Sequence, residues 1–461
     1  MSASSAFYNI TPKMWNKLLH FSSFPQSGIS LQQMVMFGSN PSQGTLLRAG
    51  NFLSEELPIR LAHRCVELNT LPNELSEMPS IRKVLGWYAH SFDELVHFPQ
   101  PNIPPDVRAQ LFAPTNRRAD RLPEASPNLA QLEDENTPGP VSGSGSGNGI
   151  GNGNGNTNGN NAAQTTHKYR RIPIESRYHA HTPDLEWPPS VAHYNESFTR
   201  LLEGIKRRHD SVVPTIAQGV LEYKQHQRSA GGVDTDIQSF LDRFYMSRIG
   251  IRFLIGQHVA LNALTPHHPD YVGIICKRTN VRDVCDEAID NARFIAEDHY
   301  ALFKPPQVQL ICPPNLEISY VPGHLNHIVF EIIKNSLRAV IERFGVDAED
   351  QMPPIKVIVA AGNEDITIKI SDEGGGIPRS AIPLIWTYMY TTMEGSALDP
   401  EFEQSGSDYK APMAGLGYGL PLSRLYARYF GGDLRLISME GYGTDVYIHL
   451  NRLSSSAEPL Q

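Results

Sequence analysis

The sequence of 461 residues has few cysteines, and none of them is spaced for metal or disulfide chemistry. The four cysteines are Cys65, Cys276, Cys285 and Cys312, and no two of them form a C-x-x-C pair. This pattern argues against a disulfide scaffold or a structural zinc site, and it predicts buried, reduced thiols in a non-oxidising compartment. No apolar run approaches the roughly 18 residues that a membrane-spanning helix needs, so we expect no membrane span.

The sequence also lacks an excess of positive charge. Its formal net charge is −9 at pH 7, which argues against a nucleic-acid-binding protein. Acidic residues are missing from the start of the chain, where none precedes Glu55, whereas serines are frequent there. A start of this composition resembles an organelle-targeting segment, and we expect one within residues 1–20.

Residues 21–265 have the periodicity of a helical domain. Apolar residues recur every three or four positions in four long stretches, at 53–72, 80–98, 195–226 and 234–264. Ser54 is the candidate start of the first helix, and Pro214 predicts a kink or a boundary in the third. Four long amphipathic segments predict an antiparallel four-helix bundle.

A compositional break separates the second of these stretches from the third. Residues 124–167 include the run SGSGSGNGIGNGNGNTNGNN, which is almost free of apolar side chains. Such a segment cannot bury enough apolar area to offset the entropy lost on ordering. We therefore expect a disordered loop insertion without chemistry of its own.

From about residue 266 the pattern becomes mixed. Short β-rich runs such as IKVIVAA and ITIKISD alternate with expected helices at 281–300, 323–343 and 419–430. In ITIKISD the isoleucines alternate with polar residues, as in a strand with one buried face. The predicted fold class is α+β, with the helical bundle followed by an α/β sandwich over residues 266–452 and a short tail at 453–461.

Three glycine-rich segments lie in this second half: SDEGGGIP at 371–378, GLGYGLPLSR at 415–424 and EGYGTD at 440–445. Glycine lets backbone N–H groups approach phosphate oxygens, and the second segment opens an expected helix whose N-terminus attracts anions. The P-loop sequence and the HRD and DFG signatures of ordinary protein kinases are absent. One such segment would be a routine turn, but three in order indicate a phosphate-binding site.

The helix HIVFEIIKNSLRA carries a polar stripe on an apolar background. His327, Glu331 and Asn335 are four residues apart and share one face, and Arg338 follows. The stripe is either a helix edge whose polar residues satisfy one another or the wall of a cleft, and the glycine segments favour the cleft. There an asparagine oxygen would suit Mg²⁺, and Glu331 would act as a base with His327 hydrogen-bonded to it. Lys334 is predicted to point elsewhere, into solvent.

The order of the striped helix and the glycine segments resembles the histidine-kinase-like ATPase superfamily, which includes gyrase and chaperone ATPases. Over nearly its whole length the chain resembles the mitochondrial 2-oxoacid dehydrogenase kinases, and pyruvate dehydrogenase kinases in particular. The segments that carry this resemblance are ELPIRLAHR, VVPTIAQGVLEYK, LDRFYMSRIGIR, YVPGHLNHIVFEIIKNSLRA and YGLPLSRLYARYFGGDLRLISMEGYGTDVYIHL. The resemblance implies a four-helix bundle followed by an ATP-binding domain, with ATP between the striped helix and a flexible lid.

The resemblance also implies a function. The enzyme would transfer phosphate from ATP, with Mg²⁺, to a serine of pyruvate dehydrogenase E1 alpha and so inactivate the complex. It would be a homodimer in the mitochondrial matrix and would dock on the lipoyl domain of the E2 core. The chain departs from animal relatives after DVYIHL, where NRLSSSAEPLQ replaces a long tail with an Asp-Trp pair, so the docking mode is left open.

The family's site residues carry over by position. Glu331 would be the general base supported by His327, Asn335 would hold Mg²⁺, and Asp372 would bind the adenine amino group. The residues expected at the nucleotide are Glu331, Asn335, Arg338, Asp372, Gly374, Gly376, Thr391, Thr392, Gly415, Leu416, Gly417, Tyr418, Gly419, Leu420 and Thr444. Residues 415–420 match the family's lid.

A second pocket is implied within the bundle, where pyruvate-like carboxylates inhibit the family's kinases. Its residues are Tyr88, Ser91, His209, Ser247, Arg248, Ile251 and Arg252. Lys206 stands where related sequences often have arginine, so a planar bidentate contact is lost there. The spacing alone fits surface ion pairs of Arg248 and Arg252 equally well.

Three alternatives remain open. The segment YVGIICKR and the short tail look like branched-chain 2-oxoacid dehydrogenase kinases. The segment HDSVVP, which starts at His209, has the spacing of the phosphoacceptor box in two-component histidine kinases. A chaperone- or gyrase-like ATPase would use the same domain with its glutamate activating water instead of a serine.

Overall fold

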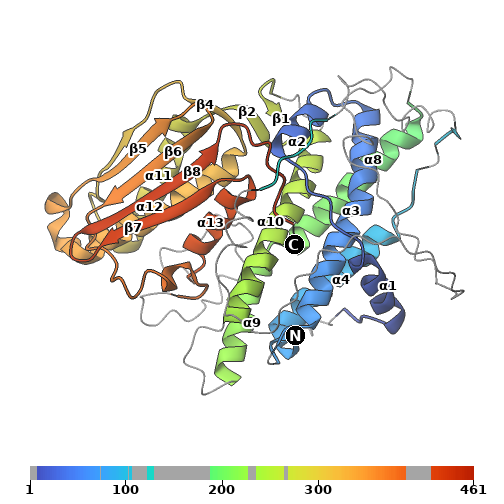
Figure 1. Cartoon of the computed structure of the whole chain (residues 1–461), viewed down its shortest axis with the longest axis horizontal. Coiled ribbons are helices and arrows are strands. Elements are labelled where there is room, and N and C mark those ends of the chain that lie inside the picture. Colours follow the sequence, from blue (N-terminus) through green and yellow to red (C-terminus); the bar gives the residue numbers. More distant parts are fainter. Residues whose placement is uncertain are drawn as a thin grey trace, which may run out of the picture.

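The computed structural model describes residues 8–72, 74–101, 103–105, 122–128, 187–226, 235–263, 268–390 and 417–460. The N-terminal part of the described chain is helical, and the C-terminal part combines helices with two sheets (Figure 1). The mixed helix-and-sheet class predicted from the sequence is therefore present.

The helical half is built around α3. Its elements are α1 (Pro12–Ser22), α2 (Leu31–Gly38), α3 (Gln43–Asn69), η1 (Leu75–Glu77), α4 (Pro79–Val96), α8 (Pro189–Arg208), α9 (Val212–His226) and α10 (Thr235–Leu261). Helix α3 contacts α1, α4, α8 and α10, and α4 also contacts α9. The sequence predicted a kink or a boundary at Pro214, and this residue lies in the first turn of α9, which begins at Val212.

The predicted start of the first long helix at Ser54 is wrong. Helix α3 begins after Ser42, whose side chain accepts a hydrogen bond from the backbone N–H of Thr45 at 3.2 Å. Ser54 lies inside the helix and donates its hydroxyl to the carbonyl of Asn51 at 2.9 Å. The helix also continues through Pro58, because the core buries the residues on both sides of this proline.

The C-terminal half is an α/β sandwich. A small sheet has the order β1 (Tyr271–Val272), β2 (Ile275–Asn280), β4 (Glu317–Tyr320), and a larger one has the order β3 (Val308–Ile311), β5 (Ile355–Ala361), β6 (Asp365–Asp372), β8 (Gly443–Asn451), β7 (Asp433–Met439). The helices of this half are α11 (Val281–Tyr300), α12 (Pro322–Phe344) and α13 (Gly419–Tyr429), with the short turns η3 (Val346–Gln351) and η4 (Leu384–Trp386). All pairs in the larger sheet are antiparallel except β3 with β5.

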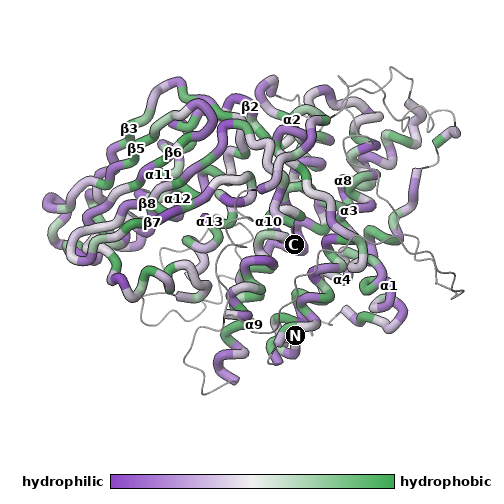
Figure 2. The backbone as a smooth tube through the Cα atoms, viewed as in Figure 1, coloured by the Kyte–Doolittle hydropathy of each residue, from purple (hydrophilic) through white to green (hydrophobic). Residues whose placement is uncertain are grey.

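One face of the larger sheet is covered by helices. On β6 the side chains of Ile366, Ile368 and Ile370 are fully buried, whereas Thr367 and Lys369 face the other side. This alternation is visible along the strands in Figure 2. The alternation confirms the period-two pattern predicted from the sequence. Helix α12 packs against this sheet at β6.

Two predicted segments are only partly described. Of the insertion predicted at 124–167, the structure describes 124–128, where Ser126 forms a β-bridge with Ser456 near the end of the chain, and the rest lies outside the described residues. Of the predicted targeting segment, residues 12–20 belong to α1, whose Met14 and Leu18 are buried. Within the described parts of the chain, no helix is long and apolar enough to cross a membrane.

The contact between α4 and α9 gives a test of the helical packing. A Cβ at Gly219 of α9 would lie 2.7 Å from the side chain of Ile81 on α4, so Gly219→Val should lower the free energy of unfolding by about 1–3 kcal/mol. A Cβ at Gly204 of α8 would meet nothing within 4 Å, so Gly204→Ala should raise it by about 0.5–1 kcal/mol. Urea unfolding of both variants measures these changes, and an unchanged midpoint for Gly219→Val would contradict the packing.

Candidate functional site

A cavity of about 600 Å³ lies between α12, the ends of β6 and β8, and the start of α13. Ten of the residues predicted at the nucleotide line it: Glu331, Asn335, Arg338, Asp372, Gly374, Gly376, Gly417, Gly419, Leu420 and Thr444. Thr391, Thr392, Gly415 and Leu416 lie outside the described residues. The volume is within the usual range for sites that bind small molecules.

Helix α12 separates its apolar and polar residues as the sequence predicted. Ile328, Val329 and Ile333 are fully buried, whereas Asn335 is exposed in the cavity wall. The helix opens with a proline in its first turn, where the missing N–H costs nothing. Glu331, Asn335 and Arg338 of the polar stripe therefore form one wall of the cavity.

The expectation for Lys334 is wrong. Its ammonium group donates to Glu331 Oε1 at 2.8 Å, and only 2% of the residue is exposed. The two residues are one helical turn apart, and the lysine ammonium lies 5.3 Å from the ring centre of Phe330. A buried carboxylate needs a partner of opposite charge. Lys334 is this partner for Glu331, and the sequence had not indicated it.

The Glu331 carboxylate also touches the start of α13. A Cβ at Gly419 would collide with Glu331 Oε2, so only glycine lets the two elements come this close. Among the residues that the structure describes, no side chain caps the N-terminus of α13. The first backbone N–H groups of this helix are thus available to an anion in the cavity.

Asp372 closes the opposite end of the site at the last residue of β6. Oδ1 accepts hydrogen bonds from the backbone of Gly374 at 3.0 Å and Thr444 at 3.3 Å, and Oδ2 accepts one from Ser336 Oγ at 2.9 Å. Burial raises the pKa of this carboxyl, and the three hydrogen bonds partly oppose that rise. The carboxylate is therefore fixed in one orientation before any ligand arrives.

Cationic side chains accompany these groups. Lys334, Arg338 and Arg343 all line the cavity. The Nε of Arg338 donates to Glu342 at 2.7 Å, and Arg343 donates to the carbonyls of Glu373 and Tyr442 at 2.7 and 2.6 Å. Lys334 and Arg338 are paired with the lining carboxylates Glu331 and Glu342, so Arg343, whose charge has no carboxylate partner in these contacts, and the N-terminus of α13 are the groups that suit a phosphate.

A resident metal would find few protein ligands. Among the described residues no group of three His, Cys, Asp or Glu side chains is placed to hold an ion. The oxygen of Asn335, which is exposed in the cavity wall, fits a Mg²⁺ ion that takes its other ligands from phosphate and water.

His327 and Tyr418, two further predicted site residues, do not line the cavity. The His327 ring lies 5.0 Å from the ring of Tyr426 on α13. Tyr418 is buried, and its ring lies 5.8 Å from Tyr245 on α10 and 5.3 Å from Tyr388. Tyr418 thus contacts the helical half at the point where α13 begins.

The second predicted pocket is a cluster between α4, α8 and α10. The rings of His209 and Tyr88 stack with centres 4.4 Å apart, and Ser91 Oγ lies 3.0 Å from His209 Nε2. An Nη atom of Arg248 donates to the His209 carbonyl at 3.5 Å, and Ile251 is buried on the same helix. Burial, with Arg248 and other arginines nearby, lowers the pKa of His209 to about 3, so this ring is neutral at physiological pH.

Two members of this predicted set have other surroundings. Arg252 donates to Asp210 Oδ1 at 2.8 Å, and Ser247 lines a separate small cavity. The sequence analysis missed Arg208, which donates to Ser91 Oγ and Glu94 Oε2, both at 2.7 Å. The only signal for Arg208 was its place beside His209.

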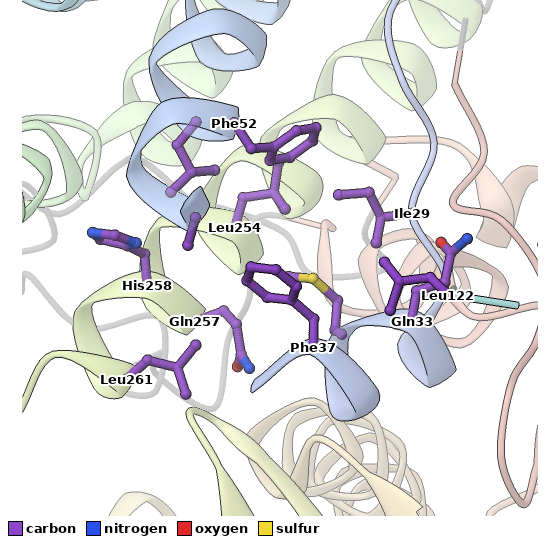
Figure 3. A pocket seen from close by; sticks show the side chains of 12 residues that line it. Ile29, Gln33, Phe37, Phe52, Leu122, Leu254, Gln257, His258 and Leu261 are labelled. Atoms are coloured by element: carbon purple, nitrogen blue, oxygen red, sulfur yellow. The ribbon is translucent and has the colours of Figure 1, made fainter. Parts of the chain in front are cut away.

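An apolar cavity of about 60 Å³ lies between α2, α3 and α10 (Figure 3). Phe37, Phe52 and Leu254 line it, and His258 lies at one side. Neither ring nitrogen of His258 has a hydrogen-bond partner within the described parts of the chain, and burial lowers its pKa to about 4. This cavity could not be predicted from the sequence, because its lining residues come from several segments of the chain and share no motif.

Comparison with known proteins first gives the class of the C-terminal half. Residues 320–454 match the profile described as "Histidine kinase-, DNA gyrase B-, and HSP90-like ATPase". The segment includes α12, the larger sheet except β3, and α13, and so contains the walls of the large cavity. This half is an ATPase domain of that class.

The rest of the chain makes the assignment specific. Residues 28–276 match the profile described as "Mitochondrial branched-chain alpha-ketoacid dehydrogenase kinase". The chain is 46% identical to the mitochondrial pyruvate dehydrogenase kinase of Schizosaccharomyces pombe, across 95% of this chain and 96% of that protein. It is 39% identical to the Arabidopsis thaliana enzyme (94% and 93% covered) and 34% identical to human isozyme 3 (95% and 84%). The chain belongs to the family of mitochondrial 2-oxoacid dehydrogenase kinases.

The two buried histidines predict a pH dependence of stability. The pKa values of His209 and His258 in the folded protein, about 3 and about 4, lie well below the usual value near 6.5. As pH falls below about 6.5 the unfolded chain binds protons that the folded chain does not, so the free energy of unfolding should fall by up to ~1.4 kcal/mol per pH unit for each histidine. His258→Leu should remove one of these contributions in urea unfolding between pH 7 and 5. An unchanged slope would contradict the assignment.

Proposed function

We propose that this protein is a serine kinase that phosphorylates the E1 alpha subunit of pyruvate dehydrogenase with ATP and Mg²⁺ and thereby inactivates the complex. The observation that carries the proposal is the buried Glu331 carboxylate, which lines the large cavity and lies against the N-terminus of α13. The names of the relatives support the choice of substrate.

The chemistry assigned to these residues is phosphoryl transfer. The N-terminus of α13 and the cationic wall hold the triphosphate, and Asn335 contributes an oxygen to the Mg²⁺, which neutralises charge on the phosphates. Glu331 accepts the proton of the substrate hydroxyl as its oxygen attacks the γ-phosphorus and ADP departs. Lys334 orients Glu331 through their ion pair. His327 lies one helical turn before Glu331 on the same face of α12.

The adenine end of ATP is assigned to Asp372 and Thr444. Asp372 is held by three hydrogen bonds at the closed end of the cavity, and Thr444 is its partner in the register of β6 and β8. A carboxylate oriented in this way accepts a hydrogen bond from an exocyclic amino group. Residues 415–420 would form the lid with Tyr418 as its anchor, and Thr391 and Thr392 would contact the nucleotide.

The remaining assignments concern the two domains, the N-terminal segment and the second predicted pocket. Residues 21–265 form a four-helix-bundle domain that binds substrate and regulators, residues 266–452 form the catalytic domain, and residues 1–20 direct the chain to the mitochondrial matrix. The cluster of Tyr88, His209 and Arg248 binds an inhibitory pyruvate-like carboxylate, because cationic and neutral donors meet there in a buried setting.

Two partners complete the proposal. The lipoyl domain of the E2 core docks on the helical half, where the apolar cavity beside Phe37 suits a narrow acyl arm. The kinase forms a homodimer, and the uncovered face of the larger sheet, with Ile311 57% and Ile358 37% exposed, is the candidate contact. Exposed apolar side chains on an open sheet favour a partner there.

Substitutions on α12 separate the proposed roles. Glu331→Gln should keep ATP binding but slow phosphate transfer by about 10²–10⁴-fold, because the base is removed while the metal ligand stays. Asn335→Ala should instead weaken Mg²⁺-dependent ATP binding by about tenfold to a hundredfold. Calorimetric titration with ATP and single-turnover transfer measure the two effects. Transfer at the parent rate by Glu331→Gln would rule out its role as the base.

Substrate choice is tested with purified E1 proteins. Incubation with ATP and Mg²⁺ should label a serine of pyruvate dehydrogenase E1 alpha and leave branched-chain E1 nearly unlabelled. Efficient labelling only of branched-chain E1 would instead establish the function named in the profile that matches residues 28–276. Acid-labile label on the kinase itself would indicate a histidine kinase, although His209 is only 1% exposed. Rapid ATP hydrolysis without an acceptor would indicate a chaperone-like ATPase.

A further inference from the structure

The last described residues of the chain return to its beginning. Residues 454–460, which we call the C-terminal strap, follow β8 and lie between the ATPase half and the helical half (Figure 1). The strap accepts a hydrogen bond at the Ser454 carbonyl from the Gln32 N–H at 3.1 Å. The N–H groups of Ala457 and Glu458 donate to the carbonyls of Ser126 and Ile29 at 2.8 and 3.2 Å.

A buried carboxylate fixes the strap in place. Glu458 is only 3% exposed, and its Oε2 accepts a hydrogen bond from Arg60 Nη1 at 2.9 Å. The same carboxylate accepts a short hydrogen bond from the hydroxyl of Tyr429. Burial and the neighbouring carboxylate raise the pKa of Tyr429, so its hydroxyl remains a donor. Arg60 belongs to α3 and Tyr429 to α13, so one side chain joins both halves of the molecule.

The surroundings are built to receive this group. Glu56, one turn before Arg60 on α3, accepts from Arg60 Nε at 3.0 Å and from the Ser27 N–H at 2.8 Å, so two carboxylates share the guanidinium. Gly250 of α10 lies against it, and a Cβ there would be 3.0 Å from both the guanidinium and the Glu458 carboxylate. A buried guanidinium between two carboxylates, with a glycine beside it, forms a specific docking site for Glu458.

The strap also connects to the large cavity. Tyr429 is the last residue of α13, and Gly419 at the other end of this helix touches Glu331 in the cavity. A helix of 11 residues is a rigid connection between the two points. Binding of a nucleotide at one end of α13 is thereby linked to the position of the other end.

We propose that the C-terminal strap is an intramolecular latch, with Glu458 as its pin, that couples the nucleotide site to the helical half. When the pin is in place, the two halves unfold as one unit and a nucleotide bound to one half stabilises both. When the pin is removed, the contact of α13 with α10 remains but the coupling weakens, so the nucleotide stabilises the helical half less. The predicted effect of a nucleotide rests on the proposed nucleotide site, whereas the latch itself does not.

The test uses the full chain with Trp386→Phe as background, because the other three tryptophans, Trp15, Trp87 and Trp187, all lie in the helical half. Tryptophan fluorescence then follows unfolding of that half alone. Saturating ADP with Mg²⁺ should raise the fluorescence Tm of the parent, because a ligand that binds only the folded state stabilises the whole cooperative unit. In Glu458→Gln this rise in Tm should be at most half of the parent's, while ADP still binds by calorimetry.

Two further variants control the experiment. Glu364→Gln makes the same change at an exposed residue and should behave like the parent. Tyr429→Phe removes one hydroxyl from the cluster and should reduce the rise without abolishing it, which keeps the test available should Glu458→Gln fold poorly. A full ADP-dependent rise in Glu458→Gln would overturn the proposal.

Hydrogen exchange decides the latch without a nucleotide. The amides of Ala457 and Glu458 should exchange roughly tenfold or more faster in Glu458→Gln and measurably faster in Tyr429→Phe, and should stay at the parent rate in Glu364→Gln. Unchanged exchange in both pin variants would exclude the latch. If the parent shows no ADP binding, the nucleotide site is refuted while the exchange result still stands for or against the strap.

Discussion

The buried ion pair between Glu331 and Lys334 is the interaction on which the rest of the site depends. Both side chains are almost completely buried on α12, and removal of one partner from such a pair leaves a charge that costs about 3–5 kcal/mol. The pair therefore holds the carboxylate in a single place. Without it, the Glu331 side chain would turn toward water, because a buried carboxylate without a partner is costly.

The sandwich then places the other groups relative to this pair. Packing of α12 on the sheet turns its polar face toward the loops after β6 and before β8, and the register pairs Asp372 with Thr444 at the closed end. Helix α13 brings its uncapped N-terminus to the opposite end, against Glu331. The cavity is thus lined by two carboxylates fixed by hydrogen bonds, Glu331 and Asp372, by cationic side chains and by the N-terminus of α13, groups that can bind the amino group and the phosphates of a nucleotide.

The sequence predicted those features that follow from local patterns. Spacing along α12 and alternation along β6 depend only on helix and strand periods, so the buried isoleucines and the cavity positions of Glu331, Asn335 and Arg338 were predicted correctly. His327 shares their predicted face but does not line the cavity and packs against Tyr426. The position of Lys334 was predicted wrongly, because its partner Glu331 is also charged and a charged pair on a helix is usually expected to lie in solvent. The start of α3 was missed because Ser42 and Ser54 offer equivalent caps, and tertiary burial decides between them. The contacts of the C-terminal strap could not be predicted, because Arg60 and Glu458 are far apart in the sequence and belong to no motif.

The most direct measurement is a crystal structure of the full chain with a non-hydrolysable ATP analogue and Mg²⁺. The account predicts the triphosphate at the N-terminus of α13, the Asn335 oxygen on the metal, and the Glu331 carboxylate within hydrogen-bonding reach of the γ-phosphate or of a water in line with it. A nucleotide bound elsewhere, or bound here with Glu331 and Asn335 turned away from the metal and phosphates, would contradict it.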